Sequence, residues 1–283
     1  MKTIIEILKL SQQFLEQQGV LSPRRSAEEL LSHQLKMSRL DLYVNFEMPL
    51  YEKDLQALRE SLRRRAKGEP VDYIFGEMKF HQLELVVNSS VLIPRQETEI
   101  LLTKVIERLT GIDLKEKTAW DLCCGSGCLG LGLKKAFPDL HLILSDISKP
   151  ALDVARANSM KNGLEVEFLQ GDLLEPFKGK KADFILCNPP YISQKDYDVL
   201  SREVRDFEPK EALIGGPKGD EFYERLAQNL PAFLNPGAHL FFEIGFNQGE
   251  TVKKLFSASH WKQVILEKDW AGHDRFIYME YFP

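Results

Sequence analysis

The sequence lacks the features of a membrane or secreted protein. No apolar run in its 283 residues approaches the roughly 18 residues that a membrane helix needs. The N-terminal Met1-Lys2-Thr3 leads into an amphipathic pattern and not into a signal peptide. Cysteine is scarce, and three of the four cysteines lie together at residues 123–128, which does not resemble a disulfide framework. We therefore expect a cytoplasmic protein that does not associate with membranes.

Two further absences restrict the kind of ligand. The cysteine stretch has neither the Cys-x2-Cys pairs nor the nearby His ligands of a zinc site, so no metal is expected. The net charge of −5 gives no global attraction to nucleic acid, and no direct nucleic-acid binding is expected. The run Arg63-Arg64-Arg65-Ala66-Lys67 is either a contact surface for RNA or an acidic partner, or a solvated helix end.

The first 69 residues read as a small helical domain. Ile4, Leu8 and Leu15 lie at helical spacing, and Ser22-Pro23 is typical of an N-cap followed by proline at the first helical position. A further helix is expected over 53–67, before Gly68-Glu69-Pro70. Residues 73–93 then alternate apolar and polar positions, which predicts a hairpin linker between domains over residues 70–95.

Residues 96–283 alternate between predicted helices and strands. Helices are expected over 96–108, 128–137, 149–160, 220–234 and 248–257, and strands over 118–122, 140–145, 165–169, 182–187, 238–244, 262–267 and 275–281. Such alternation predicts an α/β fold with an open parallel sheet and helices on both faces.

A glycine-rich turn follows the first of these strands. Gly125, Gly127 and Gly130 match G-x-G-x-x-G, and Asp146 follows about 20 residues later at the end of the next strand. The pattern fits NAD, FAD or S-adenosylmethionine, and also a tight structural turn. Asp172, after the third strand, could accept a hydrogen bond from an adenine amino group. These residues fall at successive strand ends, the edge where α/β sheets bind ligands.

Asn188-Pro189-Pro190-Tyr191 ends the strand 182–187 and lies on the same edge. The prolines stop the strand, because proline cannot donate to the ladder. Asn188 Oδ1 and the Pro189 carbonyl are acceptors suited to a planar NH2 group, and Tyr191 could stack on its face. A nucleotide-like cofactor beside such a clamp indicates methyl transfer to nitrogen, although an ordinary strand-to-loop turn remains an alternative for this stretch alone.

Several longer strings extend this pattern along the chain. They include Pro70-Val71-Asp72-Tyr73-Ile74-Phe75-Gly76, Ile93-Pro94-Arg95-Gln96-Glu97-Thr98-Glu99, Phe207-Glu208-Pro209-Lys210, Glu243-Ile244-Gly245 and Asp269-Trp270-Ala271-Gly272-His273-Asp274-Arg275. With the two motifs above, they make residues 70–280 resemble the HemK/PrmC family, the protein-(glutamine-N5) methyltransferases that modify class 1 peptide-chain release factors.

The resemblance implies a Rossmann-like methyltransferase fold and a cofactor, S-adenosylmethionine, which becomes S-adenosylhomocysteine. It implies cofactor-binding residues at Cys123, Cys124, Gly125, Ser126, Gly127, Asp146, Asp172, Leu173 and Asn188. It also implies that Asn188, Pro189, Pro190 and Tyr191 hold the substrate glutamine, with the GGQ motif of the release factor as partner. Cys123 and Cys124 replace the usual Gly-Thr of the family loop, and Cys123 is tolerable if its φ stays below zero.

In the implied mechanism, Asn188 Oδ1 and the Pro189 carbonyl orient the amide nitrogen and stabilise its developing positive charge. No general base is assigned, although Glu97, Glu99 and Glu243 are possible. The alternative enzyme is an adenine-N6 methyltransferase acting on DNA or RNA, but only about 90 residues follow Tyr191, and no downstream target-reading domain fits. A non-catalytic module that docks on release factors or ribosomes, and a nicotinamide oxidoreductase, are further alternatives.

Overall fold

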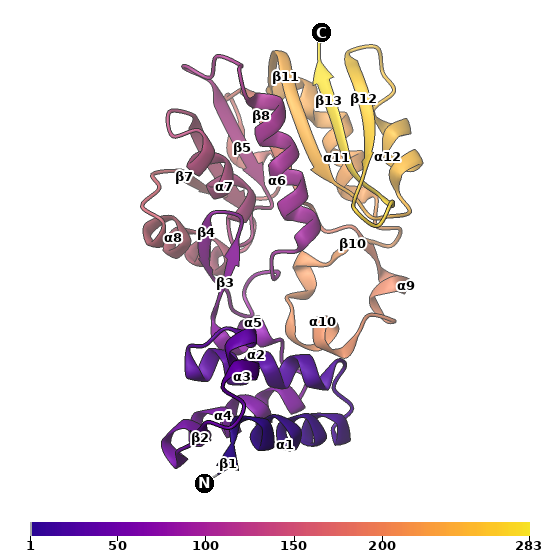
Figure 1. The fold of residues 1–283 in the computed structure, drawn as a ribbon. Coiled ribbons are helices and arrows are strands. Elements are labelled where there is room, and N and C mark those ends of the chain that lie inside the picture. The colour runs from indigo at the N-terminus through magenta and orange to yellow at the C-terminus, as the bar shows by residue number, and fades with distance from the viewer. Residues whose placement is uncertain (1) are drawn as a thin grey trace. The chain divides into compact units, whose positions relative to one another are not determined.

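The computed structural model describes residues 2–283 and divides into two compact units (Figure 1). One unit extends to Gly76 and includes Ser201–Phe207, and the other comprises Glu77–Leu200 and Glu208–Pro283. The predicted boundaries at residues 69 and 95 stay predictions. No sequence pattern indicated that a segment as late as Ser201–Phe207 belongs with the N-terminal unit.

The N-terminal unit is helical, as predicted. Its elements are β1 (Lys2–Thr3), α1 (Ile4–Gln17), α2 (Pro23–Leu35), α3 (Arg39–Val44), β2 (Pro49–Leu50), α4 (Glu52–Ala66), α5 (Val71–Phe75) and α10 (Arg202–Phe207). Ile4, Leu15, Leu30 and Leu42 are fully or almost fully buried in its core. Ser22 stands before α2 with Pro23 at the start, but it has a φ of 52° and its hydroxyl makes no capping bond.

The predicted hairpin is present and belongs to the second unit. Strands β3 (Glu77–Phe80) and β4 (Leu83–Val86) pair antiparallel and bury Phe80 and Leu83. The side-chain amide of Asn158, in the helix α8 (Lys149–Lys161), fixes the edge of the hairpin, because Oδ1 accepts from the Val86 amide at 2.6 Å and Nδ2 donates to the Val86 carbonyl at 3.1 Å.

The second unit is built on a seven-stranded sheet with the order β12-β13-β11-β8-β5-β6-β7. Its strands are β5 (Thr118–Leu122), β6 (His141–Asp146), β7 (Glu167–Gln170), β8 (Ala182–Cys187), β11 (Leu234–Glu243), β12 (Trp261–Lys268) and β13 (Asp274–Tyr281). The α/β fold is confirmed, but the expectation of an all-parallel sheet is wrong. The strands β7, β6, β5, β8 and β11 are parallel, whereas β13 runs antiparallel to both β11 and β12.

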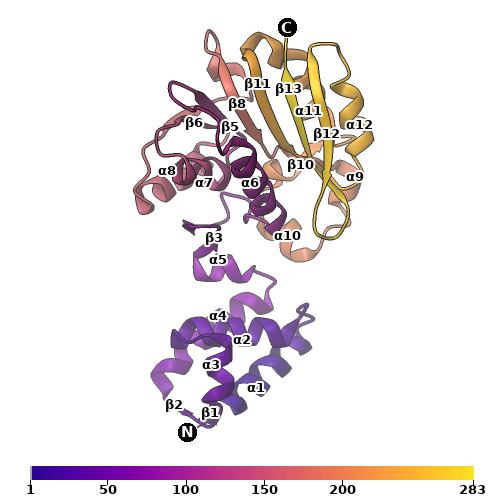
Figure 2. The same ribbon diagram turned by 45° about the horizontal axis from the view of Figure 1, so that its top comes forward.

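Helices cover both faces of this sheet (Figures 1 and 2). The bounds are α6 (Gln96–Leu109), α7 (Cys128–Ala136), α8 (Lys149–Lys161), α11 (Glu221–Asn229) and α12 (Gly249–Leu255). Side chains alternate along each strand, so Phe184 and Leu186 of β8 pack with α6, α7 and α8, while Ile185 and Cys187 pack with α11 and α12. Each face therefore has its own apolar core.

The segment after β8, which the sequence predicts to be a loop, contains short elements. They are β9 (Ile192–Ser193), α9 (Gln194–Tyr197), a 3-10 turn at Lys210–Ala212 and β10 (Ile214–Gly216), and β9 pairs parallel with β10. A 3-10 turn at Glu175–Phe177 precedes β8, and another at Leu230–Phe233 precedes β11.

The register of the sheet aligns the strand ends that carry the predicted site. Leu122 of β5 pairs with Cys187 of β8, and Cys187 pairs with Phe242 of β11. The residues that follow these positions, Cys123, Asn188 and Glu243, therefore lie at three adjacent strand ends of one edge.

Candidate active site

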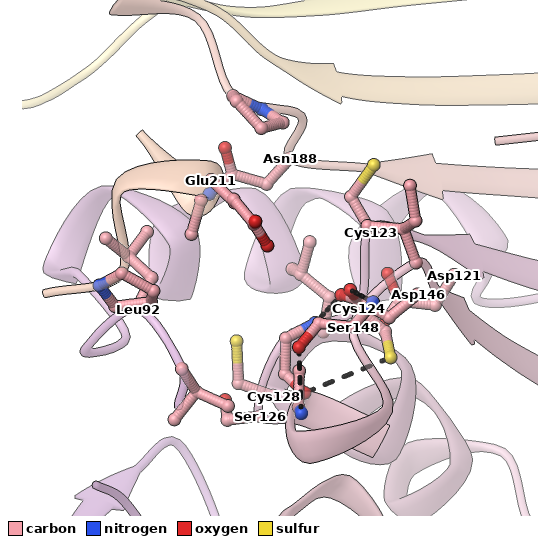
Figure 3. A pocket seen from close by; sticks show the side chains of 18 of the residues that line it. Leu92, Asp121, Cys123, Cys124, Ser126, Cys128, Asp146, Ser148, Asn188 and Glu211 are labelled. Carbon is pink, nitrogen blue, oxygen red and sulfur yellow. Dashed lines mark hydrogen bonds between the residues drawn. The ribbon is translucent and has the colours of Figure 1, made fainter. Parts of the chain in front are cut away.

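A pocket opens at the carboxyl edge of the parallel strands. Its lining includes Leu92, Thr98, Asp121, Cys123, Cys124, Gly125, Ser126, Cys128, Asp146, Asp172, Leu173, Asn188, Pro190 and Glu211. Figure 3 shows Asn188 and Cys123 on one side of it and Ser126 and Cys128 on the other. The lining includes every residue predicted to bind cofactor except Gly127, but not Pro189 or Tyr191.

The loop between β5 and α7 supplies one wall of the pocket. Gly127 has a φ of 80° at the start of α7, and an added Cβ would lie 3.0 Å from Leu144 Cδ2, so both backbone and space favour glycine there. Cys123 has a φ of 55°, so the condition under which a side chain is tolerable there, a negative φ, is not met. The β5–α7 turn requires left-handed backbone at this position, which a side chain disfavours.

Asp146 closes the same wall from the end of β6. Its Oδ2 accepts from the Gly125 amide at 2.8 Å, and its Oδ1 accepts from the Ser148 amide at 2.9 Å. Burial raises the pKa of this carboxyl above its usual value, against the lowering effect of those amides. The carboxylate thus ties the glycine turn to the loop after β6 while lining the pocket.

Asp172 and Leu173 line the pocket from the loop that follows β7. Asp172 Oδ2 forms an ion pair with Arg225 Nη2 at 2.7 Å, so this carboxylate already has a cationic partner. Leu173 is buried and has a φ of 50°. Their predicted place beside the adenine stays a prediction.

Asn188 is half-buried at the end of β8 and reaches both the pocket and a buried polar group. Its Nδ2 donates to Thr98 Oγ1 at 3.3 Å, and Thr98 Oγ1 donates to Glu243 Oε2 at 2.7 Å. Thr98 lies in α6 and Glu243 ends β11, and both are almost fully buried. The side-chain amide nitrogen of Asn188 is therefore hydrogen-bonded to a buried residue of the protein interior.

Tyr191 contacts the same carboxylate from the other end of the Asn188-Pro189-Pro190-Tyr191 segment. Its hydroxyl donates to Glu243 Oε1 at 3.2 Å, and burial raises the pKa of the phenol well above its usual value. Gln248 fixes its main chain, because Nε2 donates to the Tyr191 carbonyl at 3.0 Å and to the Gly219 carbonyl at 2.9 Å. The predicted stacking of Tyr191 on a substrate amide stays a prediction.

Comparison with known proteins identifies the family. The PrmC N-terminal domain matches residues 6–76, and the Methyltransferase small domain matches residues 96–206. The release factor glutamine methyltransferase of Chlamydia trachomatis serovar L2 is 40% identical over 97% of this chain and 93% of its own, and that of Bacillus subtilis (strain 168) is 39% identical over 98% and 97%. This chain belongs to the release factor glutamine methyltransferase family.

A solved structure agrees with the fold. The ribosomal protein L11 methylase from Lactobacillus delbrueckii subsp. bulgaricus superposes with a TM-score of 0.52 over 73% of this chain and 99% of its own, at 17% identity. At that identity the likeness shows the fold alone. It confirms the Rossmann-like methyltransferase architecture, and the sequence resemblance to the family is confirmed by the relatives.

Two carboxyl groups of this methyltransferase are buried beside the pocket. Burial raises the pKa of Asp121 to about 7, although its Oδ2 accepts from the Gly130 amide at 2.8 Å. Burial likewise raises the pKa of Glu243 to about 7, against the lowering effects of Thr98, Arg275 and Tyr191. Both carboxyl groups therefore have a pKa well above that of a carboxyl group on the protein surface.

The sequence did not single out Thr98 as a site residue. It stands four residues before Leu102 and seven before Val105, both fully buried, so its place on the inner face of α6 could be inferred from periodicity. Its partner Glu243 lies 145 residues away, and no local signal reveals that pairing.

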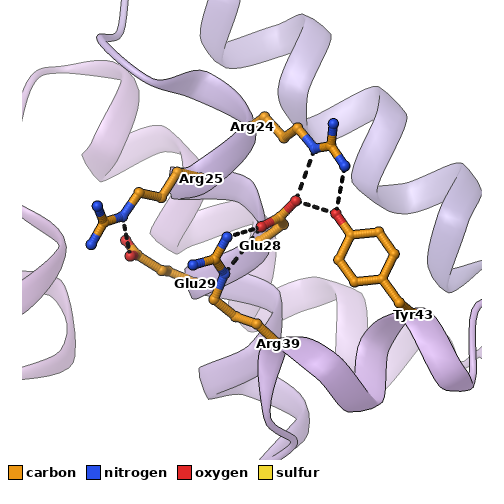
Figure 4. A network of polar contacts seen from close by, with 6 residues as sticks. All are labelled: Arg24, Arg25, Glu28, Glu29, Arg39 and Tyr43. Carbon is orange, nitrogen blue, oxygen red and sulfur yellow. Dashed lines mark hydrogen bonds and ion pairs between the residues drawn. The ribbon is translucent and has the colours of Figure 1, made fainter.

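The arginine run of the N-terminal unit is paired within that unit. Arg63 Nη1 lies 3.4 Å from Glu60 Oε2, and Arg64 Nε donates a hydrogen bond to Glu69 Oε2. Arg65 is buried and bonds Glu203 at 2.8 Å. In a second cluster, Arg24, Arg39 and Tyr43 converge on the buried Glu28, beside an Arg25–Glu29 pair (Figure 4). These arginines serve internal ion pairs, which disfavours the interpretation of residues 63–67 as a free basic patch.

Within residues 2–283, no three His, Cys, Asp or Glu side chains are grouped so as to hold a metal ion. None of the helices in this described part of the chain has the length and apolar character needed to cross a membrane.

Proposed function

We propose that this chain transfers the methyl group of S-adenosylmethionine to the side-chain amide nitrogen, N5, of the glutamine in the GGQ motif of class 1 release factors. The observation that carries the proposal is that Asn188 lines the same pocket as Cys123, Gly125 and Asp146. The proposed clamp for a planar amide therefore borders the pocket in which we place the methyl donor. The reaction belongs in the cytoplasm, where its protein substrate acts in translation termination.

The pocket residues fit such a cofactor. The loop at Cys123–Ser126 and the apolar Leu92 and Leu173 offer close backbone approach and apolar walls to a nucleoside. Asp146 and Asp172 offer carboxylate acceptors for its ribose hydroxyls and adenine amino group. When bound, S-adenosylmethionine supplies an electrophilic methyl group on a sulfonium sulfur.

The residues at the end of β8 have the task of making a poor nucleophile competent. A carboxamide nitrogen is weakly nucleophilic because its lone pair is delocalised into the carbonyl. Asn188 Oδ1 and the Pro189 carbonyl accept its two N–H bonds and aim the nitrogen at the methyl carbon. With S-adenosylmethionine bound, these oxygens would stabilise the positive charge that develops on the substrate nitrogen as it accepts the methyl group and S-adenosylhomocysteine leaves, and the nitrogen would then lose one proton.

Asn188→Ala tests this assignment. We expect methyl transfer to fall by about 100-fold or more, while affinity for S-adenosylhomocysteine changes only a few-fold, because the glycine loop and Asp146 remain. Transfer of labelled methyl to a release factor, located by mass spectrometry, measures the first quantity, and calorimetry measures the second. Asn229→Ala is the matched control, since Asn229 is exposed and bonds only the Arg225 carbonyl.

Two outcomes would contradict the proposal. If Asn188→Ala transferred methyl groups near the wild-type rate, the assignment of Asn188 as a clamp for the substrate amide would be refuted. Labelling of DNA or RNA by the wild-type protein, with none on the release factor, would favour the adenine-N6 alternative instead.

A further inference from the structure

A buried chain of hydrogen bonds stands behind Asn188. It runs from Asn188 Nδ2 to Thr98 Oγ1 at 3.3 Å and from Thr98 Oγ1 to Glu243 Oε2 at 2.7 Å. Thr98 is 2% exposed and Glu243 is 1% exposed, so solvent does not compete for the bond between these two residues. The three residues come from α6, the end of β8 and the end of β11, and the fold alone brings them together.

The chemistry of the three side chains fixes the direction of these hydrogen bonds. Above about pH 7, where Glu243 is ionised, its carboxylate can only accept, and a threonine hydroxyl carries a single proton. When that proton is donated to Glu243, the hydroxyl presents only lone pairs to Asn188. It can then bind the amide nitrogen but not the amide oxygen. Asn188 must therefore turn Nδ2 inward and leave Oδ1 for the pocket.

This direction matters because the two ends of an asparagine amide are nearly identical in shape. A flipped Asn188 would fill the same space and present N–H donors to the pocket. A substrate amide nitrogen also carries donors, so the flipped form would repel it. Shape alone cannot prevent the flip, and a fixed hydrogen-bond partner is required.

We propose that Glu243, acting through Thr98, is a positioning residue that fixes the orientation of the Asn188 amide, so that an acceptor and not a donor faces the substrate nitrogen. The proposal rests on the proposed function, in which that substrate is a glutamine side chain. Thr98 lines the pocket, but the role assigned here is exerted on the substrate through the Asn188 amide.

Other contacts hold the Glu243 carboxylate in place. Oε1 accepts from the Tyr191 hydroxyl at 3.2 Å, and the positive charge of Arg275 acts on the same carboxyl. The Glu243 carbonyl accepts from the Tyr223 hydroxyl at 2.7 Å. One carboxylate thus serves both ends of the segment that grips the substrate: Asn188 through Thr98, and Tyr191 directly.

The test compares two residues at the methylated position of the release factor. Glutamine offers N–H donors there, whereas a glutamate carboxylate offers only acceptors. The affinity ratio, glutamine form over glutamate form, is measured in the presence of S-adenosylhomocysteine. A flipped Asn188 favours glutamate, so the ratio reports amide orientation, whereas a general loss of structure weakens both forms alike.

Thr98→Val removes the hydroxyl while retaining the branched shape. We expect the ratio to fall by about tenfold and turnover on glutamine to fall with it. Both affinities are measured at saturating S-adenosylhomocysteine, so a change in cofactor affinity caused by this pocket-lining side chain does not enter the ratio. Thr98→Ser restores the hydroxyl and should recover the ratio. Thr103→Val is the control on the same helix, because its hydroxyl is exposed and donates to the Glu99 carbonyl of that helix.

Glu243→Gln provides an independent route to the same result. Its side-chain amide can donate to Thr98 Oγ1, which frees the threonine proton to donate to Asn188 Oδ1. We expect the ratio to fall as in Thr98→Val. The proposal is overturned if either variant weakens both release-factor forms equally, or if the ratio in both stays at the wild-type value.

A measurement without substrate separates this proposal from the proposed function. The Asn188 side-chain NH2 signals in a nitrogen-15 NMR spectrum should shift, and their protons should exchange faster, in Thr98→Val than in Thr98→Ser. Failure of the wild-type protein to methylate a release factor would refute the proposed function alone. Unchanged NH2 signals in Thr98→Val would refute the positioning role alone.

Discussion

The buried Glu243 predicts an unusual pH dependence of stability. Burial raises the pKa of Glu243 from 4.5 to about 7 in the folded protein. Between these values the native carboxyl holds a proton that the unfolded chain has lost. Its contribution to stability is therefore fully present below pH 4.5 and is lost as pH rises through about 7. Glu243→Gln has no such proton to lose.

The size of the effect follows from the shift. A difference of about 2.5 pKa units at 1.36 kcal/mol each gives about 3 kcal/mol. We expect Glu243→Gln and wild type to have similar free energies of unfolding near pH 4.5. By about pH 8 the variant should be more stable by up to about 3 kcal/mol, because it no longer buries a negative charge.

Urea denaturation followed by tryptophan fluorescence measures this quantity. All three tryptophans, at positions 120, 261 and 270, lie in the unit formed by Glu77–Leu200 and Glu208–Pro283, so the signal reports that unit alone. Asp121 titrates in the same window, but its contribution cancels in the difference between variant and wild type.

Glu267→Gln is the matched control on an outer strand. Burial alone would raise the pKa of Glu267, but the hydrogen bond and charge of Arg108 lower it below its usual value. Stability from Glu267 is therefore lost only as pH falls below about 4.5, and its difference curve should be flat from pH 5 to 8. If wild type and Glu243→Gln gave parallel curves, or if the variant became less stable than wild type as pH rises, the reasoning would be refuted.

Two further predictions concern backbone and packing around the pocket. Cys123→Gly should raise the free energy of unfolding by about 1 kcal/mol, because it relieves left-handed backbone at a φ of 55°; a lower melting temperature would contradict this. Gly132→Ala should destabilise by about 1–3 kcal/mol, because its Cβ would lie 2.3 Å from Leu102 Cδ2, an atom of a fully buried side chain. Leu102→Ala in the same chain should recover part of that loss, and additive losses in the double variant would show that the contact is not responsible.

Strand ends were the part of the site that the sequence predicted well. Cys123, Asp146 and Asn188 each follow or end a predicted strand, and parallel strands bring such positions to one edge. Thr98 could not be assigned because its function depends on Glu243, a partner distant in sequence. The φ of Cys123 could not be predicted from the sequence, because the residue type disfavours the left-handed backbone that the turn requires.

The sheet was predicted incompletely for a different reason. Alternating helices and strands favour a parallel sheet, and that pattern holds through β11. Only residues 269–273 separate β12 from β13, which is too short for a parallel crossover and long enough for a hairpin. The length of the link between β12 and β13, and not the hydrophobic pattern, indicates that these two strands are antiparallel.

The grouping of Ser201–Phe207 with the N-terminal unit has a consequence for genetic dissection. A fragment ending at Gly76 would leave the buried Arg65 guanidinium without the Glu203 carboxylate. A fragment starting at Glu77 would carry α10 but lose that arginine. Because neither fragment is a complete folding unit, point substitutions are the sounder way to separate substrate docking from methyl transfer.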